Sequence, residues 1–305
     1  MKSGRDFLEL DQVDAQALKA ILASAHKMKR APLSFQPLIG KTLALVFEKP
    51  STRTRVSFEV GMRQLGGQAT TLSGAEIQLG RGETIGDTGR VLSRYVDIIM
   101  LRTFAAHKLR ELAEGASVPV INGLTDHSHP CQVMADVMTV EERLGSLSGK
   151  TVVWCGDGGD NVLTSWMHIA VAFDFNLRVI CPPEFPPEPE VLRNTQKNGG
   201  RVTVTADLDA VKDANIVMTD CWVSMHNSDA GVRQQRLLPY QVDAAVMRRA
   251  SPKAIFMHCL PAHRGEEVTD EVLDGPQSVV FDEAENRLHV QKAIICWCLG
   301  IEGPK

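Results

Sequence analysis

Short apolar runs alternate with amphipathic segments along this chain, and the alternation predicts parallel sheets that are covered by helices. In the first half the expected strands are 42–47, 69–72, 97–102 and 118–121, and the expected helices are 12–30, 53–65, 84–95, 105–114 and 130–144. In the second half the expected strands are 151–155, 177–181, 201–205, 215–219, 254–258 and 278–281, and one long helix is expected over 283–299. The predicted fold class is therefore α/β.

The length of the chain predicts two domains, because 305 residues exceed the size of one ordinary hydrophobic core. The turn-rich stretch Gly145–Lys150 is the expected boundary. We expect residues 1–145 to form one doubly wound domain and 146–283 another; the C-terminal helix could pack on either, and we assign 284–305 to the first. Each sheet should be mainly parallel and flanked by helices, with the active site in the interdomain cleft.

The stretch 43–67 predicts a strand, a tight loop and a helix. Apolar residues 43–47 suit a buried strand, and Ser51 is a good N-cap. Val56, Val60 and Leu65 then fall roughly on one helical face.

The first turn of this helix has the composition of an anion site. It reads Ser51, Thr52, Arg53, Thr54, Arg55. Unpaired backbone N–H groups and the positive end of the helix dipole point outward there, so three hydroxyl groups and two guanidinium groups complete a site suited to phosphate. The alternative is an ordinary cap with solvated arginines.

Polar clusters follow several other predicted strands. They are Arg102-Thr103, Asn122 with 126–132, 156–161, 220–225 and 258–261. Taken singly, His129 and Asp220 could merely cap helices, and Cys259 could be a small buried apolar residue. Because parallel strands end at one edge of a sheet, clusters at five strand ends favour a binding site.

Charge and hydropathy exclude some classes of protein. A net charge of −4 gives no overall attraction to nucleic acid or to an anionic membrane. No run of 18 apolar residues occurs, so no membrane span is expected. The first residues lack the apolar core of a secretory signal and are too acidic for a transit peptide.

The seven cysteines are scattered and odd in number, which is typical of a reduced, cytoplasmic protein. Cys296 and Cys298 have the spacing of a metal-binding pair, but they lie in an apolar helical segment without partner ligands. We expect no metal.

The turn 156–161 invites comparison with dinucleotide-binding loops. It reads Gly-Asp-Gly-Gly-Asp-Asn, so Asn161 stands where the fingerprint has its last glycine. The next strand ends in Arg178-Val-Ile-Cys181, without the acidic residue that binds a ribose. An NAD-linked oxidoreductase is therefore an alternative that the motif does not favour.

Six motifs together resemble the ornithine carbamoyltransferases. They are Ser51-Thr-Arg-Thr-Arg55, Arg102-Thr103, His129-Pro-Cys-Gln132, Asp220-Cys-Trp-Val-Ser-Met225, His258-Cys-Leu-Pro261 and Glu285-Asn-Arg-Leu-His289. Their order and approximate spacing agree from Phe7 to the C-terminal helix. The motifs that begin at Asp220 and His258 resemble the ornithine branch, whereas an aspartate-specific relative would be expected to carry His-Pro-Thr-Gln.

The resemblance implies transfer of the carbamoyl group from carbamoyl phosphate to the δ-amine of L-ornithine, giving L-citrulline and phosphate, in arginine biosynthesis or catabolism. No cofactor is implied. The residues implied to be catalytic are Arg53, Arg102, His129, Gln132, Asp220 and Cys259. Those implied to bind carbamoyl phosphate are Ser51, Thr52, Arg53, Thr54, Gln78, Arg102, His129, Gln132, Cys259, Leu260 and Arg287.

The same resemblance places ornithine on the second domain, at Asn161, Asp220, Ser224 and Met225. Gln78 matches a residue that reaches into a neighbouring subunit's site, which implies a homotrimer with shared active sites. Small-molecule substrates are the implied partners, with no nucleic acid and no membrane.

Two other activities remain open at the level of sequence. The first is a sibling transferase that acts on putrescine, N-acetylornithine or another amine. Asp220 and Ser224, placed for a free α-amino group, argue against an acetylated substrate. The second is a non-catalytic relative that binds carbamoyl phosphate or a partner protein; Arg53, His129 and Cys259 are all present, which argues against it.

Overall fold

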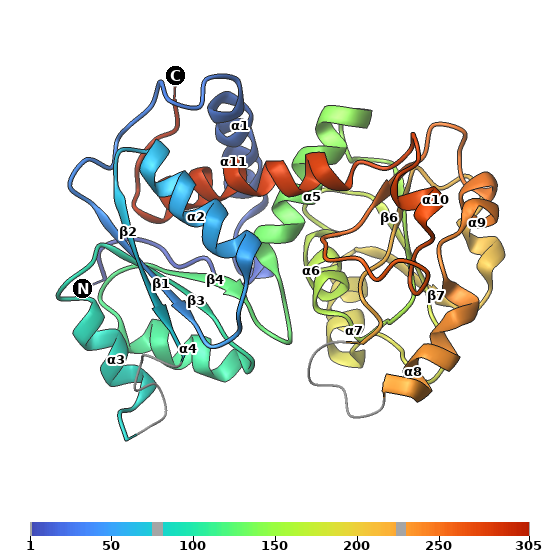
Figure 1. The fold of residues 1–305 in the computed structure, drawn as a ribbon, viewed down its shortest axis with the longest axis horizontal. Helices are drawn as coiled ribbons and strands as arrows, with labels where there is room; N and C mark the ends of the chain where they lie inside the picture. Colours follow the sequence, from blue (N-terminus) through green and yellow to red (C-terminus); the bar gives the residue numbers. More distant parts are fainter. Residues whose placement is uncertain (1, 75–81, 224–229, 305) are drawn as a thin grey trace. The chain divides into compact units, whose positions relative to one another are not determined.

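The computed structural model describes residues 2–74, 82–223 and 230–304 (Figure 1). The chain forms two compact units, the first made of Met1–Met138 and Glu285–Lys305 and the second of Thr139–Ala284. The chain enters the second unit within α5 (Pro130–Leu144) and returns within α11 (Val280–Cys298).

The first unit contains a parallel sheet with the strand order β2-β1-β3-β4. Its strands are β1 (Thr42–Phe47), β2 (Gln68–Ser73), β3 (Ile98–Arg102) and β4 (Val120–Leu124). Its helices besides α5 and α11 are η1 (Leu10–Gln12), α1 (Ala15–Arg30), α2 (Thr52–Gln64), α3 (Ile85–Leu92) and α4 (Ala106–Gly115).

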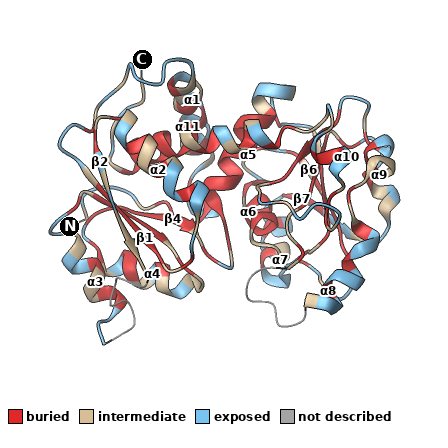
Figure 2. Ribbon diagram, viewed as in Figure 1, coloured by how far each residue is buried: buried red, intermediate tan, exposed pale blue. Residues whose placement is uncertain are grey.

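The central strands of this sheet are buried along most of their length, because helices cover both faces (Figures 1 and 2). On one face, Val46 of β1 and Ile99 of β3 pack in a cluster with Leu109 and Leu112 of α4. The alternation of side chains along a strand thus places every second residue in this cluster.

The second unit contains a parallel sheet with the strand order β7-β6-β5-β8-β9. Its strands are β5 (Thr151–Cys155), β6 (Asn176–Ile180), β7 (Arg201–Thr205), β8 (Ile216–Met218) and β9 (Ile255–Met257). Its helices are α6 (Asn161–Ile169), α7 (Pro189–Lys197), η2 (Leu208–Val211), α8 (Ala230–Leu237), η3 (Leu238–Tyr240), α9 (Ala244–Arg249) and α10 (Asp270–Leu273). Val153, Val217 and Phe256 of its three neighbouring strands share a core cluster with Val246 and Met247 of α9.

Strand register brings together the loops that carry the polar clusters. In the first unit Phe47 pairs with Arg102, so the loop after β1 lies beside the end of β3. In the second unit Met218 pairs with Trp154 on one side and Met257 on the other. In each sheet the strand order reverses at this point, where α/β proteins commonly bind ligands.

Two expectations about local structure are wrong. The expected strand at 278–281 is reduced to an isolated bridge between Ser278 and Phe256, and α11 begins at Val280. The acidic residues Asp282 and Glu283 in the first turn of α11 favour a helix start there. Val56 does not share the buried face of α2, because its exposed fraction is 51%.

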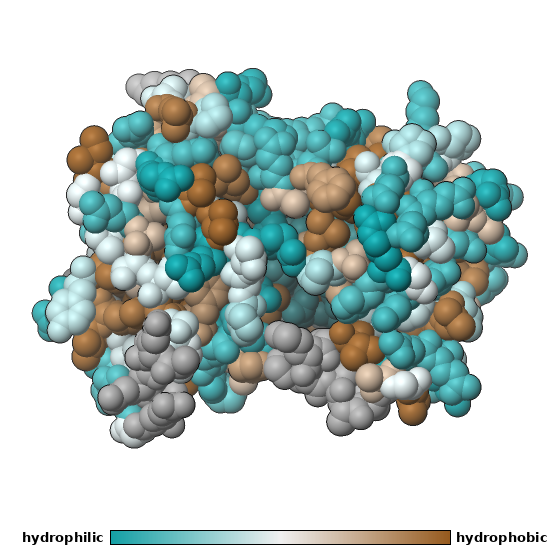
Figure 3. Space-filling view, in the orientation of Figure 1, coloured by the Kyte–Doolittle hydropathy of each residue, from teal (hydrophilic) through white to brown (hydrophobic). Residues whose placement is uncertain are grey.

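The described surface is mixed in polarity. On the face in Figure 3 hydrophilic residues predominate, and the hydrophobic ones form small separate groups. Among the described residues, no helix combines the length and the hydropathy needed to cross a bilayer.

Candidate active site

The start of α2 forms as the sequence predicts. Ser51 has an extended backbone, and its hydroxyl oxygen accepts a hydrogen bond from the Thr54 amide at 3.2 Å, so it is the N-cap. Thr52 and Arg53 are exposed in the same turn. This turn therefore presents backbone N–H groups and a guanidinium group together.

Two arginines from distant parts of the chain converge on the buried hydroxyl group of Thr54. Arg287, from α11, donates through Nη2 to Thr54 Oγ1 at 2.7 Å. Arg102, at the end of β3, donates through Nη1 to the same oxygen at 3.5 Å. With Arg53 nearby, three guanidinium groups define a strongly positive site, which suits a phosphate with several oxygen atoms.

His129 lies within this positive field. Its side chain is buried, and burial together with the charges of Arg287, Arg102 and Arg53 holds its pKa well below the ordinary value. The imidazole is therefore neutral at neutral pH and can donate one hydrogen bond to a ligand oxygen without adding a charge.

Gln132 lies in the first turn of α5 and is fully buried. Its side-chain nitrogen donates to Asp136 Oδ1, one helical turn later, at 2.8 Å. This hydrogen bond fixes the orientation of the Gln132 side-chain amide. A fixed orientation lets the side chain make directional hydrogen bonds to an amide group of a ligand.

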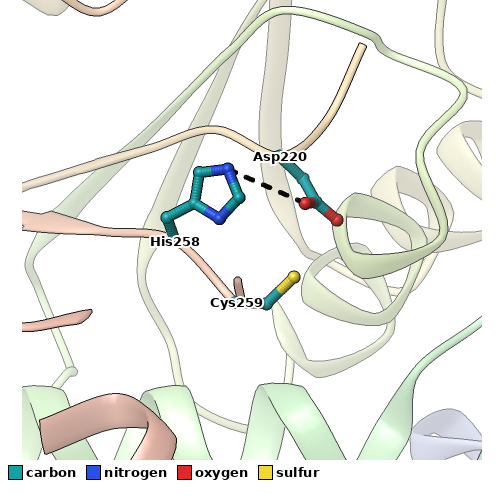
Figure 4. A group of neighbouring side chains, drawn as sticks. All are labelled: Asp220, His258 and Cys259. Carbon is teal, nitrogen blue, oxygen red and sulfur yellow. Dashed lines mark ion pairs between the residues drawn. The ribbon is translucent and has the colours of Figure 1, made fainter. Parts of the chain in front are cut away.

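The second unit holds a separate cluster at the ends of β8 and β9. Ligand-type atoms of Asp220, His258 and Cys259 lie within 4.8 Å of one another, and His258 Nε2 is 3.9 Å from Asp220 Oδ1. Figure 4 shows the carboxylate and the thiol facing the same space beside the imidazole. These residue types can also ligate a transition metal, so the expectation of no metal stays a prediction.

Cys259 is held as a neutral thiol. Burial, followed by the negative charge of Asp220, raises its pKa well above the ordinary value. A thiolate nucleophile is therefore disfavoured here, and the side chain acts as a small polar contact.

Glu267, which the sequence did not single out, organises the loop that carries Cys259. Its Oε1 faces His258 Nε2 at 3.1 Å and accepts from the His263 amide at 2.5 Å. The Leu260 amide donates to His258 Nδ1 at 2.9 Å, so Nε2 must carry the ring proton and donate to Glu267. The amide of His258 donates in turn to Glu283 Oε2 at 3.0 Å.

Leu260 has a left-handed backbone conformation, with φ of 58°. This conformation costs a leucine about 1–3 kcal/mol, and it persists only when surrounding contacts impose it. The hydrogen bond from its amide to His258 is one such contact. The strain is located at a residue that the family resemblance assigns to carbamoyl phosphate binding.

The glycine-rich turn after β5 ends in an acidic helix cap. Asp160 Oδ1 accepts from the amides of Val162 at 2.7 Å and Leu163 at 3.3 Å. Burial, then the charges of Asp220 and Asp157, raise the pKa of Asp160 well above its ordinary value. Protonated Asp160 would add no negative charge beside Asn161, the first residue of α6.

The described residues thus form one cluster in each unit. Thr54, Arg102, His129 and Arg287 lie together in the first unit, and Asp220, His258 and Cys259 in the second. Gln78, Ser224 and Met225, which the sequence also predicts, lie outside the described residues.

Two α/β units, one with an arginine-rich site and the other with a carboxylate–thiol cluster, suit an enzyme that binds an anion and a second, cationic substrate. Two family models match this chain. The aspartate/ornithine carbamoyltransferase carbamoyl-P binding domain matches residues 5–142, and the Asp/Orn binding domain of the same family matches residues 148–298. The chain belongs to the aspartate/ornithine carbamoyltransferase family and is a carbamoyltransferase.

Individual relatives agree over nearly the whole chain. An ornithine carbamoyltransferase of Nitrobacter winogradskyi is 57% identical and covers 99% of both sequences. The solved structure of ornithine carbamoyltransferase from Pyrococcus furiosus is similar with a TM-score of 0.93 at 46% identity, over 99% of both chains. An N-acetyl-L-ornithine transcarbamylase structure is similar with a TM-score of 0.88 at 32% identity, over 96% of this chain and 99% of that one.

Proposed function

We propose that this enzyme transfers the carbamoyl group of carbamoyl phosphate to the δ-amine of L-ornithine, releasing L-citrulline and phosphate. The observation that carries the proposal is the convergence of Arg102 and Arg287 on the Thr54 hydroxyl group, next to neutral His129. The relatives at 54–57% identity that are named ornithine carbamoyltransferases support the choice of amine.

The first unit is assigned carbamoyl phosphate. Six residues hold its phosphate group: Ser51, Thr52, Arg53, Thr54, Arg102 and Arg287. His129, together with Arg53 and Thr54, donates to the carbamoyl oxygen, and Gln132 orients the carbamoyl amide.

The second unit is assigned ornithine. Asn161, Asp220, Ser224 and Met225 hold its amino-acid end. Cys259 and the Leu260 carbonyl group lie beside the reacting δ-amine and carbamoyl group. Asp220 is a charged partner for an ammonium group, and the neutral thiol of Cys259 adds no second negative charge that would favour the ammonium form of the δ-amine.

The reaction begins when the neutral δ-amine attacks the carbamoyl carbon. Negative charge then grows on the carbonyl oxygen, where Arg53, Thr54 and His129 donate. The C–O bond to phosphate breaks, and the proton that the amine nitrogen loses passes to the departing phosphate. Each such donor typically contributes about 10²–10³ in rate. Holding two reactants in position contributes roughly 7–11 kcal/mol.

Supplying the neutral amine is the main cost of this mechanism. A δ-ammonium with the lysine pKa of about 10.4 leaves roughly one molecule in 2,500 neutral at pH 7. That deficit is about 4.6 kcal/mol, which one or two oxyanion donors can offset. We assign the selection of the neutral amine to Asp220 and Cys259.

We also propose that the enzyme is a cytoplasmic homotrimer in which Gln78 enters the site of a neighbouring subunit. The free thiols of all seven cysteines support a reducing compartment. We propose as well that the two substrates meet in a cleft between the two domains.

A colorimetric citrulline assay with a panel of amines tests the proposed function. With carbamoyl phosphate present, ornithine should be carbamoylated far faster than putrescine or N-acetylornithine. Preference for putrescine or N-acetylornithine would show that the enzyme is a carbamoyltransferase for that amine. No turnover with any amine would favour a non-catalytic relative.

A further inference from the structure

A second cluster of ligand-type side chains lies beside the proposed ornithine site. Cys221 follows β8, and His263 and Glu267 lie in the loop after β9. The cysteine sulfur, an imidazole nitrogen and a carboxylate oxygen of these residues all lie within 4.8 Å of one another. None of the three is assigned to either substrate.

Glu267 contributes an oxygen that lacks a hydrogen bond. Its side chain is fully buried, and Oε1 is occupied by His258 and by the His263 amide. Oε2 accepts no hydrogen bond from any residue in the described part of the chain. A buried carboxylate oxygen of this kind is costly unless a further group binds it.

The available oxygen lies beside the side chain of His263. Oε2 lies 3.7 Å from His263 Nδ1. Tetrahedral zinc, with bonds of about 2.0–2.3 Å, places its ligand atoms about 3.3–3.8 Å apart. The His263–Glu267 separation already meets that spacing, and the Cys221 sulfur lies within 4.8 Å of a ligand atom of each residue.

A tight turn fixes the spacing of the two loop ligands. The Gly265 amide donates to the Val268 carbonyl at 2.9 Å, and Gly265 has φ of 84°, a conformation that glycine adopts readily. This turn folds the chain between His263 and Glu267, so both side chains reach the Cys221 side of the loop.

The remaining contacts resemble those that orient metal ligands. The hydrogen bond between Glu267 Oε1 and His258 holds the carboxylate so that Oε2 is presented. Cys221 Sγ is 2.9 Å from the Pro261 carbonyl oxygen, which fixes the direction of the thiol. The His263 side chain is 45% exposed, so an ion can enter from solvent.

We propose that Cys221, His263 and Glu267 bind a divalent transition-metal ion of the zinc type. Thiolate, imidazole and carboxylate together favour zinc over magnesium or calcium. As the sulfur–metal bond forms, the thiol loses its hydrogen bond to Pro261 and its proton passes to solvent. Three protein ligands leave a fourth position for water.

Cobalt(II) chloride is the probe that tests this site, because thiolate-bound cobalt has an intense charge-transfer band in the near ultraviolet. Chelator-treated full-length protein should bind one equivalent of cobalt with this band, and zinc chloride should displace it. Cys221→Ser should abolish the band, and His263→Ala should weaken metal binding at least about tenfold. The matched controls Cys259→Ser and His107→Ala should retain the band.

A band that survives Cys221→Ser but disappears in Cys259→Ser would place the metal at the Asp220–His258–Cys259 cluster and overturn the proposal. Absence of any band at one equivalent would overturn it as well. If Cys221→Ser fails to fold by circular dichroism, X-ray absorption of the zinc-loaded Cys259→Ser variant decides, because Cys221 is then the one cysteine left in the two clusters. One sulfur and at least two nitrogen or oxygen neighbours support the site, and no sulfur neighbour refutes it.

Discussion

At the scale of single residues, the Thr54 hydroxyl group is where three distant parts of the sequence meet. Its oxygen accepts hydrogen bonds from Arg287 and Arg102, and it lies one residue from Arg53. Because burial reduces screening by solvent, these charges reinforce one another at the site. They also explain why His129 is neutral, since an imidazolium there would meet three like charges.

Arg53→Ala should lower kcat/KM for carbamoyl phosphate by about 10²–10³, because a donor to the developing oxyanion is lost. Arg55→Ala is the matched control: the sequence also placed Arg55 in the anion site, but its exposed guanidinium group pairs with Glu59 at 3.0 Å, a contact worth about 0.3–0.5 kcal/mol. Steady-state kinetics and calorimetry of carbamoyl phosphate binding measure both variants. Near-normal kinetics in Arg53→Ala would refute its role as an anchor.

Asp220→Asn should leave carbamoyl phosphate binding intact and lower kcat/KM for ornithine at least about thirtyfold, as expected when one member of a buried charge pair is lost. Asparagine keeps the oxygen that accepts from the Cys221 amide at 2.7 Å, so the loop should retain its conformation. Calorimetry with carbamoyl phosphate and then with ornithine measures whether only ornithine binding is weakened. Equal weakening of both ligands would contradict the assignment of Asp220 to ornithine.

At the scale of elements, the loop after β9 depends on Glu267 as much as on the residues expected to touch substrate. Two donors, the His258 ring and the His263 amide, share one carboxylate oxygen. Although burial favours its neutral form, hydrogen bonds from His258 and His263 hold the pKa of Glu267 below the ordinary value. The carboxylate is therefore ionised and positions the loop.

Glu267→Ala should lower the free energy of unfolding by about 1–3 kcal/mol for each donor left unsatisfied, and should reduce ornithine turnover. Glu266→Ala, at the exposed neighbouring carboxylate, is the control and should change neither quantity. Urea unfolding and the citrulline assay report the two effects. Equal stability of the two variants would show that the Glu267 hydrogen bonds contribute nothing measurable.

Glu9, near the N-terminus, positions the loop that carries His129. Glu9 Oε1 accepts from Ser128 Oγ at 2.9 Å, and burial raises the pKa of Glu9 to about 7 despite this bond. Asp11 raises the pKa further, and Arg110 lowers it. Between pH 4.5 and 7 the folded protein therefore binds more protons than the unfolded chain, so stability should fall as pH rises through this window.

Glu9→Gln should remove that pH dependence. The free energy of unfolding of the unmodified protein, relative to the variant, should decrease by about 3 kcal/mol at most between pH 4.5 and 8. Asp11→Asn, at an exposed neighbour, should keep most of the decrease. If the free energy of unfolding changed with pH in the same way in the unmodified protein and in Glu9→Gln, the raised pKa of buried Glu9 would be disproved.

Local sequence predicted these elements well where apolar runs and caps coincide. The strand 42–47 and the helix 130–144 agree with β1 and α5, and Ser51 is the N-cap that its position predicts. The segment 278–281 failed because its apolar residues suit a strand or the start of a buried helix equally well. Glu267 was missed because no local pattern records a hydrogen bond to a histidine nine residues away.

At the scale of the whole molecule, strand order decides which predicted residues meet. The sequence places Arg102 and the 51–54 turn at strand ends, but only the order β2-β1-β3-β4 makes those ends neighbours. Arg287 was included through a family resemblance, since a residue 233 positions from Thr54 gives no local signal of contact. Non-local pairing of this kind is what a single sequence leaves open.

Mixing two inactive variants tests the proposed shared site. Arg53→Ala and Gln78→Ala should each be nearly inactive as homotrimers. Subunits mixed, dissociated and reassembled should regain activity, because some sites would combine an intact Arg53 with an intact Gln78 from the neighbour. Absence of recovery in assemblies of three times 33.4 kDa would exclude sharing through Gln78.

The helix α11 carries two of the interactions described above, one turn apart. Glu283 accepts from the backbone of His258, and Arg287, four residues later, donates to Thr54. Each contact lies within one unit, because Glu283 and His258 belong to the second unit and Arg287 and Thr54 to the first. A substitution of Glu283 should therefore disturb only the loop after β9, and a substitution of Arg287 only the arginine-rich site around Thr54.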